Sequence, residues 1–544
     1  MLSAGFRHVP CRVNLPKLST CLRAGNGSCK FSTSSPVSRQ KGSKDSFLHP
    51  PEPSDKWNYN RSSLFDPSST DYSIFKRVTS NDLAKETSPP REVKMLARDF
   101  IEDSLYNPHY GYFSKKATIF DWSDDAPFEF GAMHDSAEFD ANVARRYASY
   151  EAEKQLWHTP TELFKPFYGQ AIAQCLVSEY LLKYFPYEDF IIYEIGAGNG
   201  TLALNILDFL RSEYPEVYDR TRYTIIEISG NLAQKQRQRL KKVHPGVHVE
   251  NRSAFHWKQR EPAPCFFLSM EVIDNFAHDA IRYNLDTLEP YQGLVTIDKN
   301  GDFDMIYTPV DDPLIASFLA MRSRLNHPLP FARALQTFPS LRKFYRNLPF
   351  APNLSSEEYI PTRMLSLLRT LRNHFPRHRL LLSDFSSLPD TIPGVNSPVV
   401  QTRVQGTTIP CETLLVHQGA FDIFFPTDFE RLRDMYEYTL SQPPRVARLS
   451  NTDPSIPDRS SPLTSTAFSL SLGSDFFSTR MGTTNRRRPK DGVVSASGLP
   501  IGEHKSSVFT HAEFLETYGD LSKTRLRNGE NPMLDFYKNV KFLF

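Results

Sequence analysis

A glycine-rich turn between a predicted strand and a predicted helix constrains the fold of this chain more than any other segment. The turn covers residues 194–201 and reads EIGAGNGT, directly after a β-branched apolar run. Strands and helices keep alternating after it, with further strands predicted at 223–227, 247–249, 265–268 and 379–384. Short apolar strands that alternate with helices predict a parallel sheet covered on both faces.

The spacing of the glycines indicates a class of ligand. Gly196, Gly198 and Gly200 lack Cβ atoms, so a ligand can lie against the backbone, where the following helix N-terminus offers free N–H groups. A nicotinamide-type G-x-G-x-x-G turn would need glycine at 201, where Thr201 stands. The E-x-G-x-G-x-G form that starts at Glu194 instead suits S-adenosyl-L-methionine (SAM), which has no pyrophosphate. A purely structural turn is the alternative.

Two further residues are predicted to contact the same ligand. Glu227 ends the second strand, where a carboxylate can accept both ribose hydroxyls of a nucleoside. Ser253 follows the third strand and is placed to touch the adenine edge. A solvated strand-end glutamate and an ordinary loop serine are the alternatives.

The end of the fourth strand carries the candidate catalytic residues, Glu271 and Asp274. Residues at this position of such a sheet face the reacting group of the ligand. Two carboxylates suit a cationic substrate, and a guanidinium binds a carboxylate through two parallel hydrogen bonds. Glu271 and Asp274 are therefore predicted to hold an arginine and to orient one nitrogen for methyl transfer, since positioning supplies most of the rate. As an alternative, Asp274 only caps the next helix.

The N-terminal segment is basic and free of acidic residues. The first acidic residue is Asp45, and eight basic residues and eight serines precede it. This composition, without a long apolar core, is typical of a mitochondrial transit peptide, predicted over residues 1–44; a disordered basic tail is the alternative. Removing its eight basic residues leaves 56 Lys+Arg against 62 Asp+Glu, a net charge of −6. A mature chain of that sign is not a general nucleic-acid binder.

Other features of the chain exclude some classes of protein. No apolar run of 18 residues occurs, so no membrane-spanning helix is predicted. Cys175, Cys265 and Cys411 lie outside the leader, far apart and without CxxC or Cys/His pairing, so no metal site or disulfide framework is predicted. Residues 446–505 are dense in Ser, Thr and Pro and are predicted to be disordered.

At these residues the chain resembles the MidA-like family of class I methyltransferases. That family includes a mitochondrial complex I assembly factor that methylates an arginine of a complex I subunit. The segments that carry the resemblance are 100–113, 167–169, 194–202, 227–236, 271–274, 358–361 and 419–429, with weaker similarity near 506–544.

The resemblance implies an α/β class I methyltransferase (Rossmann-like) fold: a seven-stranded sheet with its last strand antiparallel, an N-terminal helical layer and a helical insertion. It also implies a SAM-dependent, type II-like protein arginine methyltransferase of the mitochondrial matrix, acting on a respiratory-complex subunit during complex I assembly. The expected boundaries are a linker at 45–92, the helical region at 93–184, the SAM-binding core at 185–299, the insertion at 300–378, core continuation at 379–445, the disordered insert at 446–505 and C-terminal strands at 506–544.

The substrate side of the sequence departs from the family pattern. Met270 stands where a polar residue precedes the first carboxylate, Ala277 replaces a proline, and Phe385 and Ser386 replace Tyr-Gly. A Gly-Asp-Phe…Ser-Pro-Glu stretch is missing, with residues 161–163 near its place. One alternative is therefore a catalytically silent SAM-binding assembly factor. Another is a methyltransferase of mitochondrial ribosomal RNA or a ribosome assembly protein. Five arginines between 363 and 379 are compatible with RNA binding, although such a run is more often a solvated helix face.

Overall fold

A computed structural model describes the chain at residues 72–115, 126–148, 159–346, 352–388, 396–404, 407–442 and 505–544. The predicted transit peptide, most of the predicted linker and nearly all of the predicted disordered insert lie outside these residues.

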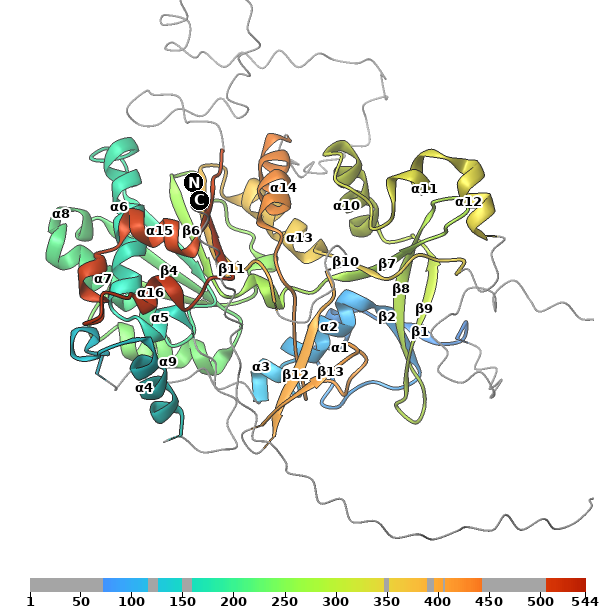
Figure 1. Ribbon diagram of the computed structural model, residues 1–544, viewed down its shortest axis with the longest axis horizontal. Coiled ribbons are helices and arrows are strands. Elements are labelled where there is room, and N and C mark those ends of the chain that lie inside the picture. Colours follow the sequence, from blue (N-terminus) through green and yellow to red (C-terminus); the bar gives the residue numbers. More distant parts are fainter. Residues whose placement is uncertain are drawn as a thin grey trace, which may run out of the picture. The chain divides into compact units, whose positions relative to one another are not determined.

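A seven-stranded sheet forms the centre of the fold (Figure 1). Its strands, in spatial order, are β15 (Val508–Thr510), β16 (Val540–Leu543), β11 (His378–Phe385), β6 (Cys265–Met270), β3 (Phe190–Ile195), β4 (Thr221–Glu227) and β5 (Val247–Asn251). The five strands from β11 to β5 are parallel to one another, and β16 runs antiparallel to β11. The predicted sheet, with its antiparallel C-terminal strand, is confirmed.

The strand order reverses beside β3. The chain passes from β3 to β4 and β5 on one side, and then crosses back to β6 on the other side. In an open parallel sheet the ligand crevice lies at such a switch point, outside the carboxyl ends of the strands. The glycine turn follows β3 and the Glu271 segment follows β6, so the topology places the two predicted halves of the site side by side.

Successive side chains of the strands divide the core into two layers, because they point to opposite faces of the sheet. Phe190 and Ile192 pack with residues of α6, α7 and α15, whereas Ile191 and Tyr193 pack with residues of α13 and α14. Figure 1 shows these two groups of helices on opposite sides of the sheet. The helices are α6 (Phe167–Lys183), α7 (Thr201–Glu213), α9 (Gly230–Leu240), α15 (His511–Tyr518), α13 (Thr362–His374) and α14 (Phe429–Ser441).

A second sheet of six strands was not predicted. Its path is β1-β2-β8-β7-β10, and β9 pairs antiparallel with β8 along residues 291–297. The strands are β1 (Lys76–Arg77), β2 (Val93–Leu96), β7 (Asp279–Tyr283), β8 (Pro290–Ile297), β9 (Phe303–Pro309) and β10 (Glu358–Ile360). A third, three-stranded sheet consists of β12 (Val399–Val404), β13 (Thr407–Cys411) and β14 (Asp422–Phe424).

The prediction that a helix begins at Val93 is wrong. Residues Val93–Leu96 form β2, paired antiparallel with β8 in the register Val93 to Ile297, and the helix α2 begins only at Ala97. Residues 279–309, which were expected to finish the SAM-binding core and open a helical insertion, instead form β7, β8 and β9. A strand partner about two hundred residues away overrides the local helical spacing.

The remaining helices include several of only four or five residues. They are α1 (Ser80–Leu83), α2 (Ala97–Tyr106), α3 (Tyr112–Lys115), α4 (Ser136–Ala148), α5 (Pro160–Leu163), α8 (Pro215–Tyr218), α10 (Pro313–Arg324), α11 (Arg333–Thr337), α12 (Pro339–Arg346) and α16 (Pro532–Asp535). None of the helices in the described parts of the chain is long and apolar enough to cross a bilayer.

Side-chain contacts at both ends of α2 hold this helix beside the ligand crevice. The buried Arg98 of α2 lies 2.7 Å from Asp279 and 2.5 Å from Asp312, which fixes α2 against the second sheet. At the other end of α2, the Tyr106 hydroxyl donates to the Asn275 carbonyl at 3.2 Å, so this helix forms one wall of the crevice. A Cβ on Gly419 would lie 1.8 Å from a backbone oxygen of a neighbouring segment, so the close packing of the loop before β14 requires glycine at this position.

Candidate functional site

The glycine turn has the backbone geometry that its sequence predicts. Gly196, Gly198 and Gly200 have φ values of +68°, +54° and +75°, in the left-handed region that glycine occupies without a steric penalty. A Cβ on Gly196 would lie 2.8 Å from a methyl group of Val272, so the turn is closed on the side away from the ligand. The helix α7 begins at Thr201, and the first N–H groups of a helix have no intrahelical acceptor.

A cavity of about 330 Å³ opens on this turn, and we call it the acidic cavity. It contains five carboxylates, and none of the described residues that line it is Lys or Arg. Its volume lies in the range of small-molecule sites. The carboxylates belong to Glu162, Glu194, Glu271, Asp274 and Asp422. Holding several negative charges in so small a volume costs free energy unless the carboxylates are protonated or a cation pairs with them.

Glu194 forms the floor of the acidic cavity next to the glycine turn. The Tyr223 hydroxyl donates to Glu194 Oε2 at 2.8 Å, and both side chains are buried. Burial raises the pKa of Glu194 to about 7, with a smaller contribution from Glu227. Glu194 therefore lies where the sequence predicted it.

Glu271 has the most unusual geometry in the cavity. Its φ is +56°, a left-handed conformation that costs a residue other than glycine about 1–3 kcal/mol and that concentrates at functional sites. Its N–H donates to the Ser383 carbonyl at 2.8 Å, which holds this conformation in place. Glu271 Oε1 is buried and has no hydrogen-bond partner in the described part of the chain. Burial, with Asp384 and Asp274 nearby, raises the pKa of Glu271 well above its usual range.

Asp274 lines the cavity, and another residue caps its turn. The turn η4 (Ile273–Asn275) is held by Asp384 Oδ2, which accepts the N–H groups of Ile273 and Asp274 at 3.0 and 3.1 Å. Among the described residues, Asp274 Oδ1 accepts the neighbouring Asn275 N–H, at 2.9 Å. Burial raises the pKa of Asp274 to about 7. Since Asp384 performs the capping role, the carboxylate of Asp274 is available to a ligand.

Two carboxylates of the cavity were missed as site residues. Glu162 Oε1 accepts a hydrogen bond of 2.6 Å from the Thr201 hydroxyl, and Lys165 lies 3.6 Å from Oε2. The signal for it was Thr159, which caps α5 and accepts the Glu162 N–H. Asp422 Oδ1 accepts from the Asn275 amide at 3.0 Å, and burial raises the pKa of Asp422 well above its usual range. Asp422 carried part of the family resemblance but had no predicted role.

The predicted nucleoside contacts lie beside a neighbouring cavity of about 440 Å³, which we call the Ser253 cavity. Ser253 lines it, and the Ser253 hydroxyl also accepts the Phe255 N–H at 3.3 Å. Phe113 lines both this cavity and the acidic cavity, so the two spaces adjoin. The lining includes residues 228–231, which directly follow β4.

Glu227 itself lies just behind the residues that line the Ser253 cavity. It is buried, its Oε1 accepts the Ser229 N–H at 2.9 Å, and its Oε2 accepts from the Gln236 amide at 3.0 Å. Burial raises its pKa. Each carboxylate oxygen has a second acceptor position, so these bonds leave capacity for a hydroxyl group. The ribose contact stays a prediction.

The arginines between 363 and 379 do not form a free basic face. Arg363 pairs with Glu102, Arg377 lies 3.0 Å from Glu188, and Arg379 lies 3.3 Å from Glu179. The remaining two, at 369 and 372, also have interaction partners. Three of the five side chains therefore serve ion pairs within the protein.

The chain is similar to proteins of one functional class. Residues 171–444, half of the chain, match a family model described as "Putative S-adenosyl-L-methionine-dependent methyltransferase". A Schizosaccharomyces pombe protein named "Protein arginine methyltransferase NDUFAF7 homolog, mitochondrial" is 26% identical over 333 residues, which cover 57% of this chain and 67% of that protein. The Saccharomyces cerevisiae protein of the same name is 22% identical over 298 residues, which cover 50% and 65%.

The chain is also similar to solved structures, including one obtained with a ligand related to SAM. A Burkholderia thailandensis protein crystallised with S-adenosyl-homocysteine is 16% identical and has a TM-score of 0.41. The match covers 66% of this chain and 74% of that one.

Proposed function

Since the chain belongs to the family of S-adenosyl-L-methionine-dependent methyltransferases, we propose that it methylates an arginine side chain of a mitochondrial respiratory-complex subunit. The acidic cavity carries this proposal, because five carboxylates without a lining Lys or Arg select for a cation. The names of the two curated relatives, which are protein arginine methyltransferases of mitochondria, support the acceptor class and the compartment.

The residues beside the glycine turn suit the methyl donor. Gly196 and Gly198 line the acidic cavity, whereas a Cβ on Gly200 would meet Leu240 of α9 and a Cβ on Gly196 would meet Val272. We assign the amino-acid end of SAM to this turn with Glu194, and the nucleoside end to Glu227 and the Ser253 cavity. When bound there, SAM supplies an electrophilic methyl group on a sulfonium.

On the acceptor side, Glu271 and Asp274 bind and orient the guanidinium. Glu271 Oε1 has an acceptor position that no described residue fills, and a guanidinium N–H satisfies it. The cation also offsets the cost of holding several buried carboxylates together. As the methylated nitrogen loses its proton, the same Oε1 is placed to receive it.

The finer features of the activity rest on the family resemblance. We propose a type II-like product, in which two methyl groups are carried by different terminal nitrogens of one arginine. We also propose the matrix as the compartment and the assembly of complex I as the process. The pairing of Arg363, Arg377 and Arg379 with carboxylates disfavours the alternative of ribosomal RNA as acceptor.

A catalytically silent SAM-binding assembly factor is the second candidate. The observation in its favour is that Met270 and Phe385, two of the positions that depart from the family pattern, lie in the wall of the acidic cavity. Incubating the purified chain with tritiated SAM and an extract of mitochondria lacking the gene separates the candidates. Methylarginine in hydrolysed protein supports the enzyme; saturable SAM binding without protein-bound label supports the silent factor.

The affinity for the acceptor is expected to rise with pH between about 6 and 8. The pKa of Asp274 is raised to about 7, while the acceptor guanidinium stays charged at all these values. Below pH 7 Asp274 is mostly protonated, and Glu271, whose pKa is raised as well, also has to lose its proton to bind the cation, so KM at pH 6 is at least ~10-fold higher than at pH 8. Steady-state KM for an arginine peptide, measured at saturating SAM at each pH, checks this.

Asp274→Asn is the control for the pH profile. This variant is expected to bind the peptide weakly at every pH and to show a smaller rise between 6 and 8. A wild-type KM that stays constant over this interval would contradict the assignment of Asp274 to the acceptor site.

A further inference from the structure

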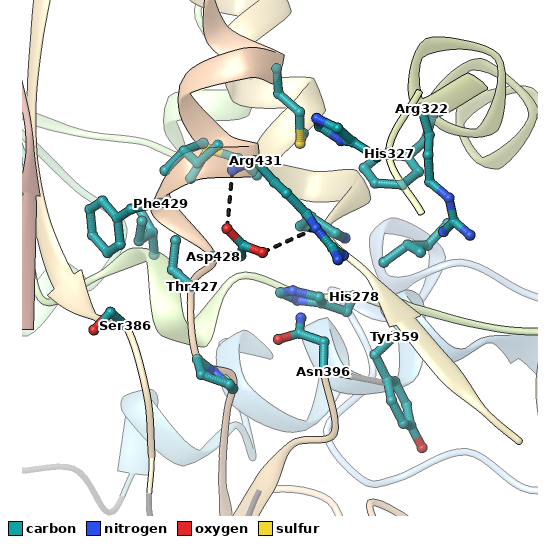
Figure 2. Close-up of a pocket in the computed structure, with 18 of the residues that line it drawn as sticks. His278, Arg322, His327, Tyr359, Ser386, Asn396, Thr427, Asp428, Phe429 and Arg431 are labelled. Carbon is teal, nitrogen blue, oxygen red and sulfur yellow. Dashed lines mark hydrogen bonds and ion pairs between the residues drawn. The ribbon is translucent and has the colours of Figure 1, made fainter. Parts of the chain in front are cut away.

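A cavity of about 390 Å³ lies next to the acidic cavity and has no role in the proposed methyl transfer (Figure 2). We call it the Arg431 cavity. Its walls come from α10, β10, α13, α14 and the segments after β6 and β11. Its polar lining includes His278, Arg322, Ser386, Asn396, Thr427 and Arg431.

Arg431 presents one edge of its guanidinium to this cavity. Asp428 caps α14 by accepting the Arg431 N–H at 3.1 Å, and its other oxygen lies 3.0 Å from Arg431 Nε (Figure 2). The carboxylate therefore fixes the side chain by its Nε. The two Nη groups have no hydrogen bond or ion pair in the described part of the chain, and the side chain is 38% exposed. Figure 2 shows this end of Arg431 pointing toward His278 and Asn396.

Of the other charged groups, Arg322 and Glu358 are paired with each other, whereas Lys541 also lines the cavity and adds a second positive charge. Arg322 binds both oxygens of Glu358, at 2.9 and 2.8 Å, and donates to the Tyr283 hydroxyl. Arg431 and Lys541 therefore give the cavity a preference for an anionic group, and the free Nη edge of Arg431 sets the direction from which that group binds. A guanidinium edge of this kind matches a carboxylate in two parallel hydrogen bonds.

His278 favours a peptide over a small anion. The ring is buried, and its Nδ1–H donates to the Phe276 carbonyl at 2.7 Å. Burial lowers the pKa of His278 to about 4, so the ring is neutral at pH 7 and its Nε2 is an acceptor. Nε2 has no partner among the residues that the structure describes, and a free carboxylate has no hydrogen to donate to it. A peptide backbone supplies an N–H donor together with an acidic side chain.

Two turns separate this cavity from the acidic cavity, and each lines both. In the first turn, Ile273 faces the Arg431 cavity, while Asp274 and Asn275 line the acidic cavity. In the segment after β11, Ser386 lines the Arg431 cavity and Phe385 lines the acidic cavity. A ligand that fills the Arg431 cavity is therefore separated from the acidic cavity by one or two side chains.

We propose that the Arg431 cavity binds an acidic side chain of the acceptor protein, located within about three residues of the methylated arginine. Three residues span roughly 10 Å of extended chain, and adjacent residues of the same two segments line the two cavities. The acceptor motif is then an arginine with a nearby Asp or Glu, because the two cavities offer carboxylates to one residue and a guanidinium to the other. This inference rests on the proposed methylation of arginine.

Synthetic peptides test the motif with the full chain. Eleven-residue peptides carry a central arginine among Ala, Ser and Gln, with one Glu at each position from three before to three after it. Gln at the same position is the matched peptide. We expect Glu at one or two positions to lower KM about tenfold relative to Gln, as a charge-assisted pair would, with kcat within twofold.

Variants of α14 assign the preference to Arg431. Arg431→Gln is expected to abolish the difference between Glu and Gln peptides by raising KM for the Glu peptide alone. Arg433→Gln is the matched control, since Arg433 lies on the same helix, pairs with Glu430 at 2.7 Å and does not line the cavity. Equal KM values for Glu and Gln peptides in the wild type, or a preference that survives in Arg431→Gln, would overturn the proposal.

A binding measurement keeps this test separate from that of the proposed function. If no peptide is methylated, the proposed function fails, and fluorescence anisotropy of labelled peptides in the presence of S-adenosyl-homocysteine decides the inference. Tighter binding of a Glu peptide that Arg431→Gln removes supports the Arg431 cavity as an acidic-residue site. Equal binding of Glu and Gln peptides, or none, rejects it.

Discussion

Replacing Glu271 by glutamine is expected to reduce methyl transfer to an arginine peptide about 1,000-fold and to leave the affinity for SAM within about twofold. Glutamine has the same shape and keeps the backbone N–H that donates to Ser383, so the left-handed turn is retained. Its amide carries no charge, presents N–H groups to a cation and cannot accept the proton of the methylated nitrogen. Losing a preorganised electrostatic partner and an acid–base group costs factors of this size.

Initial rates with a peptide acceptor, together with SAM binding by calorimetry, check this result. Glu430→Gln is the matched control, because Glu430 is 55% exposed, pairs with Arg433 on α14 and lies outside the acidic cavity. It is expected to keep the wild-type rate. If Glu271→Gln retained more than a tenth of the activity, Glu271 would not be the residue that orients the acceptor.

Replacing Gly198 by aspartate is expected to weaken SAM binding at least ~100-fold without unfolding the chain. Gly198 lines the acidic cavity at a φ of +54°, a conformation that aspartate tolerates better than most residues. The new side chain occupies space beside the turn and adds a sixth carboxylate to the cavity. Both effects act on the ligand and leave the sheet intact, so the melting temperature should change by only a few degrees.

Gly246→Asp is the control for this substitution. Gly246 is exposed before β5, and a Cβ there meets no atom within 4 Å. Calorimetric titration with SAM is expected to give the wild-type Kd for Gly246→Asp and no measurable heat for Gly198→Asp. Equal affinities of the two variants would show that the glycine turn does not hold SAM.

The central sheet and half of the site could be predicted because their signals are local. The glycine turn lies between a strand and a helix that adjoin it in sequence, and parallel strands bring the ends of β3 and β6 together by topology alone. Glu194, Glu271 and Asp274 follow from that arrangement. The structure places the three side chains in one cavity, and their roles remain proposals.

The features that the sequence did not predict depend on contacts between residues that lie far apart in the chain. The second sheet pairs β2 with β8 across about two hundred residues, and no local pattern at Val93 records that pairing. Glu162 and Asp422 reach the acidic cavity from segments far apart in the chain, so their carboxylates add to those of β6 only after folding. The same holds for Arg363 and Arg377, whose partners Glu102 and Glu188 lie far upstream.

The central claim is that the acidic cavity holds and methylates an arginine. The most direct test is quantitative mass spectrometry of methylarginine in respiratory-complex subunits from cells that carry the wild-type gene, no gene, or Glu271→Gln expressed at the wild-type level. We predict one or a few arginines whose methylation is present with the wild type and lost in both other cells. Unchanged methylarginine in cells without the gene, or full methylation with Glu271→Gln, would contradict the account.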